Sequence, residues 1–278
     1  MMTPKNSLPG SDDITREELE NGIIVLTRPN FNSPSVVISG YLASGGLFDP
    51  DEKLGLADFT AAALMRGTAK RDFQGIYDAL ETEGASLSFN GATHTTSFSG
   101  KALSEDLPLL LELLTESLLE PIFPGQQVAR LKAQLLTGLA MRAQDTRAMA
   151  SLAFDQIVYK DHPYSRPEDG FPETVEQIHR EDLIAFHKGH YGPKGMVISI
   201  VGAVDPTDAV QWARAALGNW KNPEQPQPAQ LPAVTPLTET VSAKVEIPGK
   251  SQSDLVVGIA GPPRSAPDFI AASVGNSV

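Results

Sequence analysis

Residues 55–68 decide the fold and read Gly55-Leu-Ala-Asp-Phe-Thr-Ala-Ala-Ala-Leu-Met-Arg-Gly-Thr68. The part from 56 to 65 is almost wholly apolar and small, with consecutive alanines at 61–63. A surface helix of a globular protein would carry polar residues along one face. The stretch therefore predicts a buried helix that neighbouring elements approach closely.

Strand patterns lie on both sides of this helix in the sequence. An Asn21-Gly22 turn signal precedes the first strand pattern and Pro34 precedes the second, which predicts a hairpin or a meander. Alternating or continuous apolar residues predict strands at 23–27, 36–43, 85–90, 95–103 and 196–201.

Helical spacing of apolar residues recurs between the strands. Ser104 and Asp205 are typical N-terminal caps, and Pro124 and Pro206 are typical of a first helical turn. Apolar spacing predicts helices at 73–80, 107–118, 124–139, 173–191 and 206–217. This order of strand pairs and helices predicts an α+β fold built in layers.

Proline marks a domain boundary. Within a polar stretch it recurs at positions 223, 226, 228, 232 and 236, which predicts an interdomain linker at 222–237. Before the linker we expect a disordered segment at 1–14 and a domain at 15–221.

The stretch after the linker, residues 238–278, contains strand patterns at 240–247 and 255–260 and a helix start at Asp268. It is too short to bury a core alone. Its order of elements also weakly repeats that of the start of the chain. We therefore expect a truncated start of a second, homologous domain, in a natural protein that continues beyond Val278.

Charge and composition exclude several classes of function. The formal net charge of −12 at pH 7 argues against a nucleic-acid partner. The chain has no cysteine, which excludes disulfides, thiolate catalysis and cysteine-bound metals. No segment has the ~18 uninterrupted apolar residues of a membrane span, and residues 1–13 lack the apolar core of a secretory signal. We expect a soluble bacterial protein without a membrane partner, cytoplasmic, or periplasmic if a leader was removed.

The stretch at 55–68 resembles the zinc-helix region of the pitrilysin/insulinase family of zinc peptidases, and mitochondrial processing peptidase and its bacterial relatives are the most similar type. The resemblance extends to Ala-Ser-Gly-Gly-Leu-Phe-Asp-Pro at 43–50, Glu-Pro-Ile-Phe-Pro at 120–124 and the region 162–206. It implies a processing-peptidase or LuxS-like metallohydrolase fold. In that fold a mostly antiparallel sheet has helices packed on one side, and residues 15–221 form the N-terminal, peptidase-like domain.

Active members of that family carry an H-x-x-E-H motif, in which two histidines bind zinc and the glutamate activates water. The resemblance places Asp58, Ala61 and Ala62 at these three positions. The third ligand of the family, a glutamate, is expected near Thr137 and Gly138, and residues 121–144 contain no acidic residue. The resemblance thus predicts that this chain has no catalytic residue and no metal site.

Two other candidates have plain alternatives. His187 and His190 have a spacing that suits a metal pair, but no third ligand is near in the sequence, which favours an ordinary helix end. Asp58 is favoured in the first turn of a helix by the exposed backbone N–H groups, whether or not it binds a metal.

The resemblance implies a non-catalytic subunit, or pseudoenzyme, of a heteromeric zinc metallopeptidase. It would close the peptide chamber for an active H-x-x-E-H partner that holds the zinc, and it would help to bind an extended peptide through residues beyond Val278. Whether the chain is an enzyme by itself is left open. The alternatives are a structural or assembly scaffold and a peptide-binding module, with an active zinc metalloendopeptidase the least favoured.

Overall fold

A six-stranded sheet organises the larger of two compact units. The computed structural model describes residues 10–277. These form a first unit, residues 10–136 with Glu168–Ala229, and a second unit, Thr137–Pro167 with residues 230–277. The expected disordered segment at 1–14 lies mostly outside the described residues, and its last part contains a 3-10 turn at Ser11–Asp13.

The sheet has the strand order β1-β2-β6-β3-β5-β4. Its strands are β1 (Thr15–Glu18), β2 (Ile24–Pro29), β3 (Ser35–Leu42), β4 (Ser86–Gly91), β5 (Thr96–Leu103) and β6 (Val197–Gly202). β2 and β6 run parallel and the other neighbours run antiparallel, so the mostly antiparallel sheet is confirmed. The hairpin or meander predicted from 23–27 and 36–43 is wrong, because β6 lies between β2 and β3; β2 pairs instead with β1, which was not predicted.

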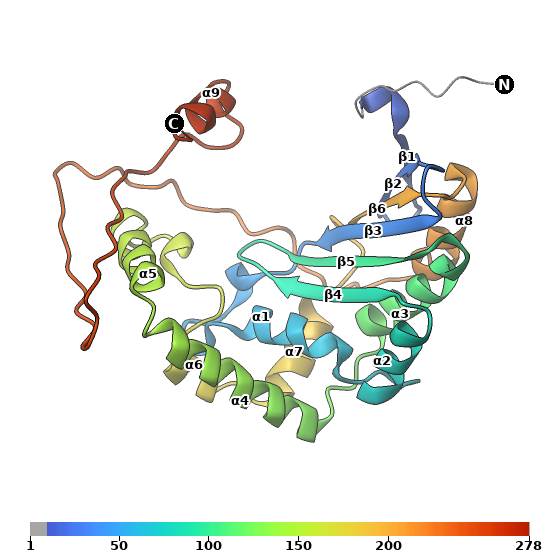
Figure 1. Cartoon of the computed structure of the whole chain (residues 1–278), viewed down its shortest axis with the longest axis horizontal. Helices are drawn as coiled ribbons and strands as arrows, with labels where there is room; N and C mark the ends of the chain where they lie inside the picture. The colour runs from blue at the N-terminus through green and yellow to red at the C-terminus, as the bar shows by residue number, and fades with distance from the viewer. Residues whose placement is uncertain (1–9, 278) are drawn as a thin grey trace. The chain divides into compact units, whose positions relative to one another are not determined.

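The helices are α1 (Leu56–Ala63), α2 (Phe73–Thr82), α3 (Leu107–Leu119), α4 (Gly125–Arg142), α5 (Thr146–Val158), α6 (Pro172–Glu176), α7 (Arg180–His190), α8 (Pro206–Leu217) and α9 (Phe269–Gly275). In the first unit, α1 contacts β4 and β5, α3 contacts β5, and α8 contacts β2. Figure 1 shows α1 and α3 on the same side of the sheet, which confirms the predicted layers.

The core lies between the sheet and these helices. Val36, Ile38 and Leu42 alternate along β3 and are fully buried, whereas Val37 and Tyr41 on the other face are exposed. The leucines predicted to face the core from α3 are buried, namely Leu107, Leu110, Leu111, Leu114 and Leu118. Alternation on the strands and helical spacing on α3 therefore meet in one hydrophobic layer.

The single helix predicted at 173–191 is two helices, α6 and α7. Asp182 accepts a hydrogen bond from the backbone N–H of His179 at 2.8 Å, which caps the start of α7. Lys132 donates to the carbonyl oxygen of Ile178 at 2.9 Å, within the break. The helix is interrupted because these side chains satisfy backbone groups that a continuous helix would pair internally.

Two helix starts also differ from the predictions. Ser104 begins a 3-10 turn instead of capping α3, which starts at Leu107. α5 was not predicted. Its sequence signal is Asp145, whose side chain accepts from the N–H of Ala148 at 2.8 Å, but Val158 is its one buried residue, so its apolar pattern is weak.

The second unit contains no strand among its described residues, so the strands expected at 240–247 and 255–260 are wrong for this structure. Leu255, Val257 and Ile259 are exposed instead. A strand needs a hydrogen-bonding neighbour, and an isolated hairpin is marginal in water. α9 follows Asp268, where the helix start was predicted. The domain boundaries remain predictions, although one division between the units falls after Ala229, inside 222–237.

No helix in the described part of the chain combines the length and the apolar character that crossing a bilayer requires.

Candidate functional site

The start of α1 is built on a buried carboxylate. Asp49 accepts hydrogen bonds from the backbone N–H groups of Gly55 and Ala57, both at 2.9 Å. A helix leaves its first N–H groups unpaired, so Asp49 acts as its cap from outside the helix. Gly55 has a φ of +95°, and a Cβ there would lie 2.9 Å from the carbonyl oxygen of Asp169. Glycine is therefore required at this position.

The side chain of Asp49 is buried, and burial changes its protonation. Burial raises the pKa of Asp49 to about 7, although the backbone N–H groups of Ala57 and Gly55 act in the opposite direction. A carboxyl group of this kind is partly protonated at neutral pH. It therefore contributes a cap to α1 rather than a permanent negative charge.

Asp58 lies in the first turn of α1, where the resemblance places the first motif residue. Burial raises the pKa of Asp58 to about 6, the charges of Asp169 and Glu168 raise it further, and the N–H of Gly91 lowers it. A Cβ at Gly91 would lie 2.5 Å from the Cα of Asp58, so the end of β4 packs directly on α1. Asp58 is thus held in a site that disfavours its charged form.

Ala61 and Ala62 follow Asp58 at three and four positions, which places the three residues on one face of α1. Ala61 is buried and Ala62 is half-buried. Zinc of the family type requires two histidine nitrogens here and a carboxylate base. Methyl groups supply neither, so these residues do not fit that zinc site.

Thr137 and Gly138, the expected third-ligand region, lie on α4 in the second unit and carry no carboxylate or imidazole. Among the described residues, no group of three or more histidine, aspartate or glutamate side chains is placed to hold a metal ion. The absence of a metal site nevertheless stays a prediction, which metal analysis tests.

A buried hydroxyl pair lies close to the two aspartates. The hydroxyl of Tyr191 is 3.1 Å from Thr96 Oγ1, which donates to the carbonyl oxygen of Ser44 at 2.9 Å. Burial raises the pKa of Tyr191, and the charges of Asp58 and Asp49 raise it further, against the bond with Thr96. Tyr191 therefore stays neutral and offers hydrogen bonding, not a base or a nucleophile.

Sequence reasoning assigned no role to Asp49, Thr96 or Tyr191. The signal for Asp49 was an acidic residue directly after the apolar pair Leu47-Phe48 and before a proline. Tyr191 had no separate signal, because its partners come from distant parts of the chain.

The two histidine rings of the pair have separate hydrogen-bond partners. Nε2 of His187 donates to the carbonyl oxygen of Leu118 at 2.8 Å, and burial lowers the pKa of His187. Nδ1 of His190 lies 3.0 Å from the carbonyl oxygen of Phe186, and its ring stacks on Phe186. Each ring has a separate backbone partner, which supports the interpretation as an ordinary helix end.

Two family models match the chain. The model described as insulinase (peptidase family M16) matches residues 24–168. The model described as peptidase M16 inactive domain matches residues 177–278. The two matches together cover residues 24–168 and 177–278, which is most of the chain.

Individual relatives agree with these matches. Mitochondrial-processing peptidase subunit beta of Saccharomyces cerevisiae is 25% identical over 236 residues, which covers 84% of this chain and 50% of the relative. Mitochondrial cytochrome b-c1 complex subunit 1 of Homo sapiens is 23% identical over 266 residues, covering 94% of this chain and 54% of the relative.

A solved structure agrees as well. The crystal structure of a peptidase M16 inactive domain from Pseudomonas fluorescens superposes with a TM-score of 0.71 at 27% identity, over 80% of this chain and 54% of that chain. The chain thus spans about half the length of the relatives it matches. On these matches, the chain belongs to the insulinase family of peptidases, peptidase family M16.

Proposed function

We propose that this chain is a non-catalytic subunit of a heteromeric zinc metallopeptidase, which closes the peptide chamber for an active H-x-x-E-H partner. The observation that carries the proposal is the composition of α1. Asp58, Ala61 and Ala62 share one face of the helix, and they provide neither two nitrogen ligands nor a general base. The zinc is then held by the partner, in the cytoplasm or the periplasm of a bacterium.

The names of the relatives support a subunit role. One relative is the beta subunit of a processing peptidase, and another is a subunit of the cytochrome b-c1 complex. Both names describe parts of multi-subunit assemblies. A chain that has lost the ligands of its family is expected to act through such an assembly.

The substrate of the assembly would be an extended peptide. β4 is an edge strand of the sheet, and its outer side pairs with no strand among the described residues. An added strand gains main-chain hydrogen bonds at such an edge whatever its sequence. β4 ends at Gly91 beside Asp58, so a peptide paired with β4 would run toward the start of α1.

A structural or assembly scaffold is the second candidate. The similarity to cytochrome b-c1 complex subunit 1 favours it, because that match covers 94% of this chain. The two candidates differ in what the chain copurifies with. A cytochrome complex would support the scaffold, and an H-x-x-E-H chain would support the peptidase subunit.

The decisive test is metal content and peptide hydrolysis on the same preparation. The chain is purified without chelators, its zinc is measured by mass spectrometry, and peptide hydrolysis is assayed with added zinc. The assay is then repeated with an H-x-x-E-H family member encoded beside it. We expect no stoichiometric zinc and no hydrolysis from this chain alone, but a higher rate when both chains are present.

A matched control is the same partner with its motif glutamate replaced by glutamine. That mixture should be inactive, because this chain contributes no base. One zinc per chain together with hydrolysis by this chain alone would overturn the proposal. A partner rate that this chain does not change would favour the scaffold instead.

A further inference from the structure

A groove runs between α3 and α8 on the outer side of the first unit. Its volume is about 390 Å³, within the range of about 300–1,000 Å³ typical of ligand sites. Pro108 and Leu111 line it from α3, and Trp212, Ala215 and Ala216 line it from α8. The small alanines leave space beside the Trp212 ring, which is 37% exposed.

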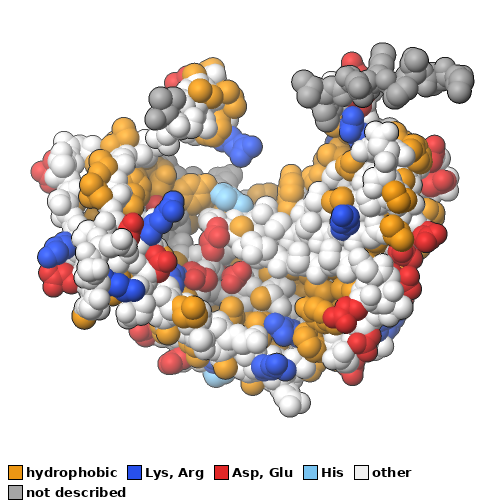
Figure 2. All heavy atoms as spheres, viewed as in Figure 1, with side chains coloured by type: hydrophobic (Ala, Val, Ile, Leu, Met, Phe, Trp, Pro, Cys, Tyr) orange, Lys and Arg blue, Asp and Glu red, His pale blue; other side chains and the backbone are white. Residues whose placement is uncertain are grey.

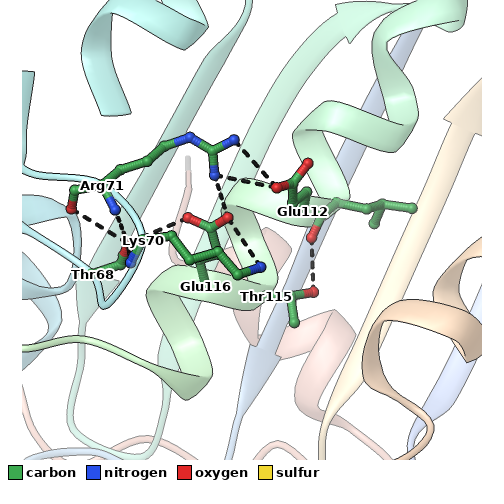
Figure 3. Close-up of polar contacts among 7 residues, drawn as sticks. Thr68, Lys70, Arg71, Glu112, Thr115 and Glu116 are labelled. Carbon is green, nitrogen blue, oxygen red and sulfur yellow. Dashed lines mark hydrogen bonds and ion pairs between the residues drawn. The ribbon is translucent and has the colours of Figure 1, made fainter. Parts of the chain in front are cut away.

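The lining of the groove includes Glu116, whose carboxylate is buried. The side chain of Glu116 is 2% exposed, and Arg71 and Lys70 form ion pairs with it. Thr68 Oγ1 also donates to Glu116 Oε2 at 3.3 Å. Figure 3 shows the Arg71 guanidinium between Glu116 and Glu112, to which Arg71 donates at 3.2 Å. These contacts hold the Glu116 carboxylate in place beside the groove.

The groove keeps an excess of negative charge after these pairs are counted. Its lining includes three glutamates, Glu112, Glu116 and Glu120, against one lysine, Lys70. Arg71 pairs with the first two of these glutamates. No hydrogen bond or ion pair of the Glu120 carboxylate is found among the described residues. Figure 2 shows acidic side chains along the side of the molecule on which Figure 1 places α3 and α8. The charge of the groove is complementary to a cation.

We infer that this groove is a docking site for an arginine side chain of a partner polypeptide, flanked there by apolar residues. A guanidinium stacks on an indole face and donates in pairs to a carboxylate. Trp212 supplies the face and Glu120 supplies the free carboxylate, while Leu111 and Pro108 contact the flanking apolar residues. Arginine suits this site better than lysine, because the planar group uses both surfaces at once.

This inference goes beyond the proposed function, because it concerns α3 and α8 and not the start of α1. It requires neither zinc nor a catalytic partner. A negative result for one of the two proposals therefore does not contradict the other.

The test measures binding of a short peptide to the full chain. The probe is Ala-Leu-Arg-Leu-Ala with an amidated C-terminus and a dye at its N-terminus, followed by fluorescence anisotropy. A second peptide carries glutamine in place of arginine. We expect the arginine peptide to bind at least about tenfold more tightly, as expected from a cation–π contact plus a charge-assisted hydrogen bond.

Variants then locate the binding site. Trp212→Ala should weaken binding of the arginine peptide about tenfold, and Glu120→Gln about threefold, with higher salt reducing the second effect. Trp220→Phe and Glu81→Gln are the matched controls, since Trp220 is buried and Glu81 is exposed on α2 outside the groove lining. Both controls should bind within about twofold of the unchanged chain.

Circular dichroism establishes that each variant is folded before its affinity is compared. No binding of the arginine peptide, equal binding of the two peptides, or unchanged affinity in Trp212→Ala would each overturn the inference. A loss of affinity in the Trp220→Phe or Glu81→Gln control equal to that in the groove variants would overturn it as well.

Discussion

The carboxyl groups at α3 and at the start of α1 have pKa shifts in opposite directions. At α3, burial raises the pKa of Glu116, but the hydrogen bond and charge of Arg71 outweigh this and the pKa lies below its usual value. At α1, burial raises the pKa of Asp49 and Asp58, and backbone N–H groups offset only part of it. The difference shows that a nearby cation, and not burial alone, decides whether the pKa of a buried carboxyl group is lowered or raised.

The carboxyl groups of Glu116 and Asp49 also have different structural roles. Glu116 ties α3 to the loop that carries Thr68 and Arg71, so its charge holds two elements together. Asp49 holds the first N–H groups of α1, and Asp58 accepts from the backbone N–H of Gly91 at the end of β4. Substitutions at these three residues test this ranking.

The largest effect is expected at Glu116. Glu116→Gln removes the charge that neutralises Arg71, and we expect a loss of about 3 kcal/mol in the free energy of unfolding. Urea unfolding measures this loss. The dependence of the unfolding free energy on urea concentration should be the same in both chains, since a change would indicate a different denatured state. Glu112→Gln is the matched control, because that side chain is 46% exposed, and it should cost less than about 1 kcal/mol. Equal losses would contradict a special role for the buried carboxylate.

Asp49 should come next. Asp49→Ala leaves two backbone N–H groups at the start of α1 without their acceptor, at a cost of about 2 kcal/mol. Asp49→Asn keeps one acceptor oxygen, so its free energy of unfolding should lie between those of Asp49→Ala and the unchanged chain. Thermal unfolding measures both variants. An alanine variant as stable as the unchanged chain would mean that these N–H groups find another acceptor.

Asp58 should show a smaller effect of opposite sign. Its pKa rises from 3.8 to about 6 on folding, so the folded chain binds more protons between these values and stability falls as pH rises through that window. Asp58→Asn should remove this fall and gain about 1 kcal/mol at pH 8, but nothing at pH 4. Unfolding curves at both pH values measure the difference. A variant that loses stability at pH 8 would refute the raised pKa.

The smallest effect is expected on zinc binding. The double substitution Asp58→His with Ala62→His restores two histidines of the family motif on α1, but the third ligand is still missing near Thr137 and Gly138. Two imidazoles alone do not form a structural or catalytic zinc site. We expect no zinc to remain after dialysis, as measured by mass spectrometry. Stoichiometric zinc would show that another residue completes the site.

Much of the fold could be predicted from local pattern. The apolar stretch at 55–68 predicted the buried α1, and Asp205 caps α8 as expected, accepting from the N–H of Thr207 at 2.9 Å. The assignment of Asp58, Ala61 and Ala62 to the motif positions stays a prediction, which rests on residue type because ligand chemistry depends on it. Helix burial and capping depend on residues that are near in the sequence, so the local pattern was enough to predict them.

The site was less predictable than the fold. The resemblance located α1 but gave no role to Asp49 or Tyr191, since neither residue type nor spacing reveals a partner far away in the chain. Glu116 had a faint signal, a charged residue within a leucine-rich helix, four positions after Glu112. Its partner Arg71 precedes it by 45 residues and was not foreseen.

By itself, the sequence determined the residue types along α1: an aspartate and alanines at 58, 61 and 62, and small apolar residues that allow the helix to be buried. Only the tertiary structure decided the insertion of β6 between β2 and β3, the capping of α1 by Asp49, and the opposite directions of the pKa shifts of Asp58 and Glu116. The physical reason is that burial and the distance to a cation depend on residues distant in the sequence, and these two quantities set the pKa of a carboxyl group.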